Sequence, residues 1–134
     1  MALSTFLFPD PGHYLDLGLL ILRIAVAVIF AYHAYTKLTK SGMMAKGMGW
    51  NPAQVVLLGL WEMIGALSLL LGVYAQIGAA MLGIVMLGAL HHKIFKWKVA
   101  FASQTGTGWE FDMILLASNI LILLTGAGAF ALLP

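Results

Sequence analysis

The stretch LGLLILRIAVAVIFAYHAYTKL, residues 17–38, decides the fold class of this chain. Arg23 is its only charged residue before Lys37, and most of its other side chains are apolar. A helix needs roughly 20 mostly apolar residues to cross the hydrocarbon core of a bilayer, which is about 30 Å thick. The stretch is long enough, so it predicts a membrane-spanning helix.

Three more apolar stretches follow, at residues 53–71, 75–92 and 110–126. Short connections between helices are typical of antiparallel neighbours. The sequence therefore predicts an all-α membrane protein, an antiparallel four-transmembrane-helix bundle. The spans leave no room for a separate soluble domain, so residues 1–134 are expected to form a single transmembrane domain.

The composition supports a membrane protein and excludes several other classes. Of the 134 residues, 62% are hydrophobic and 9% are charged, whereas soluble domains are about 45–50% apolar and about 25% charged. The chain has no cysteine, which excludes disulfide scaffolds, thiol relays, iron–sulfur clusters and cysteine zinc sites. Its seven basic residues are scattered through apolar sequence and do not predict binding to nucleic acid.

Local signals predict where the spans begin and end. Asp16 is expected to cap the first helix, and Asn51-Pro52 is a typical start for the second. Gly72 and Gly126 are suited to end the second and fourth helices. The longest connection, residues 93–107, is expected to be irregular.

The lysines predict the orientation of the chain. They lie in two connections, with Lys37, Lys40 and Lys46 after the first span and Lys93, Lys96 and Lys98 after the third. In a four-span chain these connections share one side of the membrane, and the other side has no Lys or Arg. The lysine-rich loops are therefore expected in the cytoplasm and both termini outside. Leu3, Phe6 and Phe8, before the first span, are expected to lie in the membrane interface.

Arg23, Glu62 and Asn119 are polar residues inside the predicted spans. A charge at the centre of a span costs about 2.5–3.5 kcal/mol on insertion scales, so its presence requires an explanation. At about 1.5 Å per residue, Glu62 and Asn119 lie roughly 12 Å from the lysine side, and Arg23 lies within about 9 Å of the level of Glu62. We expect all three to point into the bundle as a deep polar layer, with Arg23 extended toward Glu62.

A second group of polar residues is expected nearer the lysine side. This lysine-side cluster consists of His33, Lys37, His91, Glu110 and Asp112. No two histidines have the i, i+4 spacing of a helical metal site, so no metal is expected.

Three interpretations of the deep layer are open. Buried charges can fix helix register without any further function. Alternatively, the layer binds a small ligand such as a quinone headgroup, or it transfers protons. The sequence has no phosphate loop and no dinucleotide motif, and no catalytic residue follows from it.

Three segments resemble the DoxX family of small four-helix membrane proteins. The family's first helix is similar to DLGLLILRIAVAVIFAYHAYTKL (residues 16–38), which contains Arg23 and His33. Its second hairpin is similar to WEMIGALSLLLGVYAQIGAAMLGIVM (residues 61–86). Its last helix and the glycine-rich segment after that helix are similar to GWEFDMILLASNILILLTGAGAF (residues 108–130). The order and spacing of these segments carry the resemblance.

The resemblance implies a four-helix bundle in a prokaryotic cytoplasmic membrane. It also implies an association with redox chemistry, because some members resemble subunits of thiosulfate:quinone oxidoreductase. The expected function is an integral membrane subunit of a quinone-linked oxidoreductase system, with no intrinsic cofactor and a bound quinone, and at most a non-autonomous enzyme. The alternative is a non-catalytic membrane scaffold or assembly chaperone. The expected partners are the lipid bilayer, another membrane or membrane-associated protein, and further copies of this chain.

Overall fold

The regular elements of the chain are helices. The computed structural model describes residue 12 and residues 14–133. Its elements are α2 (Leu15–Thr39), α3 (Ser41–Met48), α4 (Pro52–Leu71), α5 (Ala75–His91), the π-helical turn η1 (His92–Lys96) and α6 (Trp109–Thr125). The predicted all-α class is confirmed for this part of the chain. The residues expected in the membrane interface before the first span lie outside the described residues.

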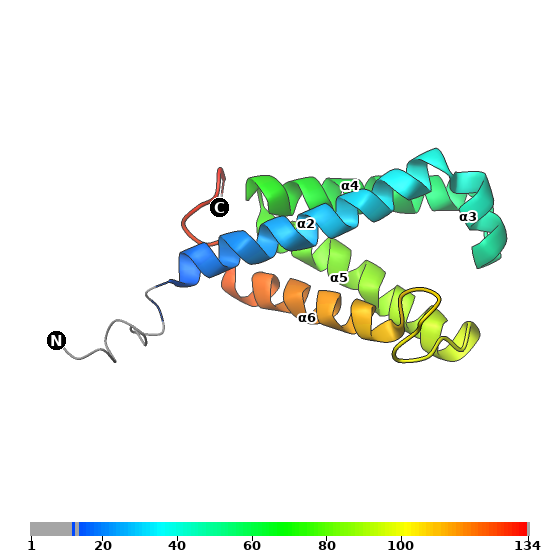
Figure 1. The fold of residues 1–134 in the computed structure, drawn as a ribbon. Coiled ribbons are helices and arrows are strands. Elements are labelled where there is room, and N and C mark those ends of the chain that lie inside the picture. Colours follow the sequence, from blue (N-terminus) through cyan, green and yellow to red (C-terminus); the bar gives the residue numbers. More distant parts are fainter. Residues whose placement is uncertain (1–11, 13, 134) are drawn as a thin grey trace.

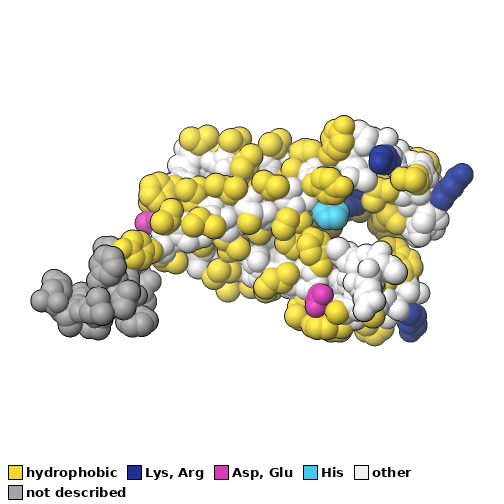
Figure 2. Space-filling view, viewed as in Figure 1, with side chains coloured by type: hydrophobic (Ala, Val, Ile, Leu, Met, Phe, Trp, Pro, Cys, Tyr) yellow, Lys and Arg dark blue, Asp and Glu magenta, His cyan; other side chains and the backbone are white. Residues whose placement is uncertain are grey.

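Three helical segments are long and apolar enough to cross a membrane: α2, α4, and α5 together with η1, Ala75–Lys96. The fourth long helix, α6, has 17 residues. Large hydrophobic side chains are exposed along the sides of the helices, and Figure 2 shows them covering the length of the molecule. A surface of this kind is suited to lipid rather than to water. The chain is a multi-pass membrane protein.

The long helices lie side by side, and the chain reverses direction between them (Figure 1). Helix α2 packs chiefly on α4, α5 packs on α6, and α4 packs on α5. The short helix α3 and η1 lie at one end, where Lys and Arg side chains project in Figure 2. We call this end the lysine end. The segment after α6 lies at the opposite end, which we call the lysine-free end.

Two glycines allow the helices to approach closely. A Cβ atom at Gly78 of α5 would lie 2.6 Å from the Cβ atom of Ser68 on α4. A Cβ atom at Gly59 of α4 would lie 3.1 Å from the Cβ atom of Lys37 on α2. Small residues at helix contacts are the usual means by which membrane helices pack tightly, and here they bring α4 close to both of its neighbours.

Most of the predicted helix boundaries are confirmed. Asn51 caps α4, because its side chain accepts a hydrogen bond from the backbone N–H of Gln54 and the Gln54 side chain accepts one from Asn51. Gly72 ends α4 in the left-handed conformation, with φ of 67°. The prediction for Asp16 is wrong. It lies inside the first turn of α2 and accepts a hydrogen bond from the backbone of Ala129 instead of capping the helix.

Two helical segments occur where loops were expected. The connection between the first two spans contains α3, which ends at Gly49 with φ of 74°. At the end of α5 the helix continues as η1 to Lys96, so the irregular part of the connection to α6 is shorter than predicted. A residue in the left-handed conformation follows each segment, Gly49 after α3 and Lys98 after η1.

Candidate functional site

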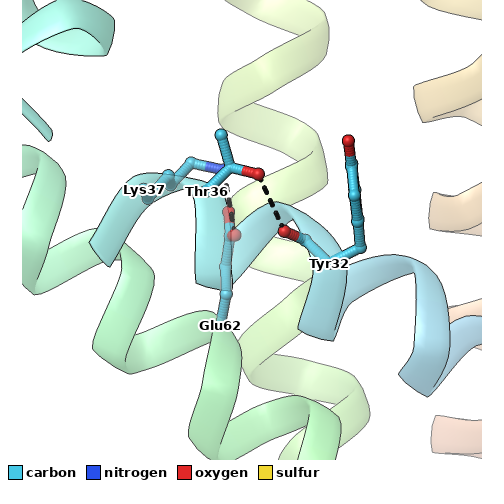
Figure 3. Close-up of polar contacts among 4 residues, drawn as sticks. All are labelled: Tyr32, Thr36, Lys37 and Glu62. Carbon is cyan, nitrogen blue, oxygen red and sulfur yellow. Dashed lines mark hydrogen bonds and ion pairs between the residues drawn. The ribbon is translucent and has the colours of Figure 1, made fainter. Parts of the chain in front are cut away.

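Glu62 forms a buried ion pair with Lys37. The carboxylate Oε2 on α4 lies 2.9 Å from Lys37 Nζ on α2, and the Glu62 side chain is 2% exposed. Figure 3 shows Glu62 rising from α4 to meet Lys37, while the nearby Thr36 hydroxyl donates to the Tyr32 carbonyl on the same helix. The expected contact of Glu62 with Arg23 is wrong, because Lys37 is its partner.

The close packing of α2 on α4 makes this pair possible. Lys37 lies in the last turn of α2, opposite Gly59 of α4. The absence of a side chain at Gly59 lets the Lys37 stem lie flat against α4 one turn from Glu62. A lysine has a long apolar stem and a charged tip, so a residue near the end of a span reaches a carboxylate that lies deeper.

A second buried ion pair joins Lys93 to Asp112. Lys93 lies in η1 and Asp112 in the first turn of α6, and Nζ is 2.6 Å from Oδ2. The Asp112 side chain is 5% exposed. Lys93 also donates to the hydroxyl of Thr107, at 3.0 Å. The pair fixes η1 against the start of α6.

His33 lies between the two ion pairs. It is half-buried on α2 and lies within electrostatic range of Lys37, Lys93 and Asp112. Its ring centroid is 5.8 Å from that of Phe111 on α6. Within the described part of the chain, the ring nitrogens of His33 have no hydrogen-bond partner. A half-buried imidazole of this kind has donor and acceptor positions left for a ligand or water.

We define the two-pair site as His33, Lys37, Glu62, Lys93 and Asp112. Four elements contribute to it, namely α2, α4, η1 and α6. Figure 2 shows the surface hollowed at the lysine end, with a histidine and a basic side chain at the edge of the hollow. Each carboxylate of the site has a lysine partner, whereas the His33 imidazole has no hydrogen-bond partner among the described residues.

The deep polar layer does not form as one unit. Arg23, Glu62 and Asn119 are all buried, but each has a different partner. The amide nitrogen of Asn119 donates to the Leu115 carbonyl at 2.9 Å. Its Oδ1 atom has no hydrogen-bond partner in the described structure. The level of a residue along the helices does not determine which side chains meet.

Arg23 binds backbone rather than a carboxylate. Its Nη1 donates to the Leu69 carbonyl at 3.1 Å, and its Nη2 donates to the Phe130 carbonyl. Both acceptors lie near the lysine-free end, at the end of α4 and in the segment after α6. Arg23 therefore extends away from Glu62.

Two members of the expected lysine-side cluster lie outside the two-pair site. Glu110 is exposed in the first turn of α6. His91 is exposed, and its ring contacts are with His92 and Phe95. Sequence reasoning missed Lys93 as a site residue, because it was assigned to an irregular loop, and no signal in the sequence pairs it with Asp112. Among the described residues, no group of three His, Asp or Glu side chains could hold a metal ion.

Comparison with known proteins identifies a family for this chain. A model of the DoxX family matches residues 18–97, from the start of α2 to the residue after η1. The match does not include α6, so the resemblance of the last helix rests on the sequence alone. No curated protein and no solved structure matches the chain significantly. Because the family match covers more than half of its residues, this chain belongs to the DoxX family.

Proposed function

We propose that the protein is an integral membrane subunit of a quinone-linked oxidoreductase system, and that the two-pair site binds the quinone headgroup. The observation that carries this proposal is the position of His33, half-buried between two ion pairs with its ring nitrogens free of hydrogen bonds to the described residues. Membership of the DoxX family gives additional support, because some members of that family resemble subunits of thiosulfate:quinone oxidoreductase.

The residues of the site are chemically suited to a quinone. Quinone carbonyl oxygens accept hydrogen bonds, and the His33 imidazole is a donor without another partner in the described structure. The Phe111 ring, 5.8 Å from the His33 ring, offers an apolar face against which a planar headgroup can pack. When bound, a quinone supplies two-electron, two-proton redox chemistry. His33 would hold or pass a proton at its ring nitrogen, and the two ion pairs would keep it in place.

The electrons must come from another protein in this proposal. The chain has no cysteine for thiol or iron–sulfur chemistry, so it supplies binding and proton exchange to a membrane or membrane-associated partner that performs electron transfer. In this proposal the chain is a non-autonomous subunit with no intrinsic cofactor, and it needs its partner for turnover.

The proposed topology has four antiparallel spans, with α6 as the fourth. The 17 residues of α6 cross about 25 Å at about 1.5 Å per residue, which suits a thin or locally thinned bilayer. All six lysines lie at or beyond the ends of α2 and α5 on the same end of the molecule. We therefore place the lysine end in the cytoplasm of a prokaryotic cell and both ends of the chain outside its cytoplasmic membrane.

Native mass spectrometry of protein released gently from native membranes tests the ligand. The unaltered protein is expected to retain a mass corresponding to a quinone. His33→Ala and Glu62→Gln are expected to lose it, because they remove the free imidazole and one charge of an ion pair. Glu110→Gln is the matched control, since it removes an exposed carboxylate at the same end, and it should retain the quinone.

The outcome also separates this function from a second candidate, a non-catalytic scaffold or assembly chaperone. The scaffold is favoured by Arg23, because two of its guanidinium nitrogens donate to backbone carbonyls of the chain itself. Protein that carries only another polypeptide, with no quinone in any variant, would contradict quinone binding and support the scaffold. Quinone retention that is equal in His33→Ala and the unaltered protein would place the ligand elsewhere.

A further inference from the structure

The segment after α6 folds back across the lysine-free end of the helices. Residues 126–133 run from the end of α6 toward the turn between α4 and α5 (Figure 1). Two glycines of this segment, Gly126 and Gly128, have φ of 82° and turn the chain across the end. Ala127 is 6% exposed and belongs to the hydrophobic core.

Backbone hydrogen bonds fasten this segment to the turn between α4 and α5. The N–H of Leu132 donates to the Leu71 carbonyl, and the N–H of Leu133 donates to the Gly72 carbonyl, each at 3.1 Å. The N–H of Tyr74 donates in return to the Leu133 carbonyl at 3.0 Å. The last carbonyls of a membrane helix need partners when they lie near the bilayer, and this segment supplies them for α4.

Two charged side chains of α2 bind the same segment. Asp16 Oδ1 accepts a hydrogen bond from the Ala129 N–H at 2.9 Å. Arg23, which is fully buried, donates to the carbonyl of Phe130 and to the carbonyl of Leu69 at the end of α4. These neighbouring residues of the segment are therefore held by an acid and a base that lie two helical turns apart on α2.

The packing around Arg23 leaves little space at this end. A Cβ atom at Gly72 would clash with Arg23 Nη1 and would lie 2.7 Å from the Cβ atom of Ala131. A Cβ atom at Gly128 would lie 3.3 Å from the side chain of Leu19. Leu19 is 4% exposed, so it lies directly beneath the segment.

We propose that residues 126–133 form a fixed seal over the lysine-free end, and that Arg23 and Asp16 are the positioning residues that hold it. The seal covers the buried side chain of Leu19 and the last carbonyls of α4. It lies beside a pocket at the same end, which is lined by the first residues of α5 and by residues 125–128. This explains a buried arginine that has no carboxylate partner among the described residues. The proposal stands whether or not the two-pair site binds a quinone.

Cysteine labelling tests the seal, because the chain has no cysteine of its own. Leu19→Cys reports on the space beneath the seal, and Tyr74→Cys, at an exposed position of the same end, is the positive control. Vesicles of known orientation are treated with a membrane-impermeant charged methanethiosulfonate. Cys at position 74 is expected to react from the lysine-free side, whereas Cys at position 19 should be protected from both sides.

Loosening the seal should expose the reporter. Hydrogen bonds to charged groups contribute about 1.5–3 kcal/mol, so losing one should raise the labelling rate at position 19 by about tenfold or more. Arg23→Gln removes the contacts to Phe130 and Leu69, and Asp16→Ala removes the contact to Ala129. Both variants should show this increase, from the lysine-free side only. Asp16 is exposed, so its replacement tests the seal even if Arg23→Gln fails to fold. Glu110→Ala, which removes an exposed carboxylate at the other end, should have no effect.

Two results would overturn the seal. One is labelling of the Leu19→Cys protein, without any second change, at the rate of Tyr74→Cys. The other is protection at position 19 that is unchanged in folded Asp16→Ala protein. Neither result depends on quinone retention, so failure of the seal and failure of the proposed function are distinguishable.

Discussion

Arg23 and Glu62 are both charged residues in apolar spans, yet the fold neutralises them in different ways. Glu62 is paired with the ammonium group of Lys37 at 2.9 Å. Within the described part of the chain, Arg23 pairs with no carboxylate and donates to two backbone carbonyls. An arginine has several donors in a planar arrangement, so it can bridge two carbonyls from separate segments, which a lysine does less well. The two charges therefore stabilise opposite ends of the molecule.

The contribution of the Lys37–Glu62 ion pair to stability can be tested with single residues. Lys37→Met leaves the carboxylate of Glu62 buried without a partner, which is expected to lower the free energy of unfolding by about 3–5 kcal/mol. Lys37→Met combined with Glu62→Gln leaves no unpaired charge and should recover most of this loss. Both values are measured by denaturant unfolding in mixed micelles.

Lys46→Met is the matched control for that experiment. Lys46 is exposed on α3, and exposed charges contribute about 0–1 kcal/mol, so the free energy of unfolding should hardly change. A double variant as unstable as Lys37→Met alone would show that the loss does not come from an unpaired Glu62 carboxylate.

The sequence predicted which polar residues are buried, but it did not predict which of them form ion pairs. Arg23, Glu62, Asn119 and Asp112 were expected to point inward, and all are buried. The cost of a lipid-exposed charge is large enough to make that inference from sequence alone. Partner choice depends on helix rotation and side-chain reach over a few ångströms, which the sequence does not specify. Glu62 was therefore grouped with Arg23 and Asn119 rather than with Lys37.

At the scale of elements, boundaries set by local chemistry were predictable and boundaries set by tertiary contacts were not. The Asn51-Pro52 start of α4 and its Gly72 end follow from capping and backbone conformation within a few residues. Asp16 has the same cap chemistry, but its acceptor is used by Ala129, which is more than 100 residues away in sequence. A distant hydrogen bond of this kind leaves no local signal.

The close contact between α4 and α5 predicts that a larger residue at Gly78 destabilises the protein. Gly78→Ala would place a Cβ atom 2.6 Å from the Cβ atom of Ser68 and 3.1 Å from the carbonyl oxygen of Gly65. The added methyl group must push α5 away from α4, which is expected to cost about 1–3 kcal/mol of stability. The change in melting temperature of the purified protein in detergent measures this effect.

Gly88→Ala is the control for Gly78→Ala, because it is on the same helix and a Cβ atom there would meet nothing within 4 Å. It should be neutral or stabilise the helix, since alanine exceeds glycine in helix propensity by about 1 kcal/mol. Equal melting temperatures for the two variants would mean that α4 and α5 separate easily and that close packing does not hold them together.

At the scale of the whole molecule, the two ends of the helices have different chemistry. The lysine end has two buried ion pairs contributed by four elements, with His33 between them. The lysine-free end is covered by residues 126–133, which are bound to α2 and α4. The difference in lysine content was visible in the sequence, but the fold-back of the last segment was not, because its contacts are mostly between backbone atoms.

The number of spans is the prediction that decides between topologies. If α6 crosses the membrane, residues on either side of it face opposite compartments. Phe101→Cys before α6 and Leu132→Cys after it are both exposed, at 47% and 74%. The Phe101→Cys protein should therefore react with an impermeant thiol reagent from the same side as a Met43→Cys protein on α3. The Leu132→Cys protein should react from the other side, together with Tyr74→Cys. Labelling of positions 132 and 43 from the same side would mean that α6 does not cross and that the chain has three spans.

The positive-inside rule further predicts that positions 43 and 101 face the cytoplasm. Comparing the labelling of intact cells with that of inverted vesicles measures this orientation directly.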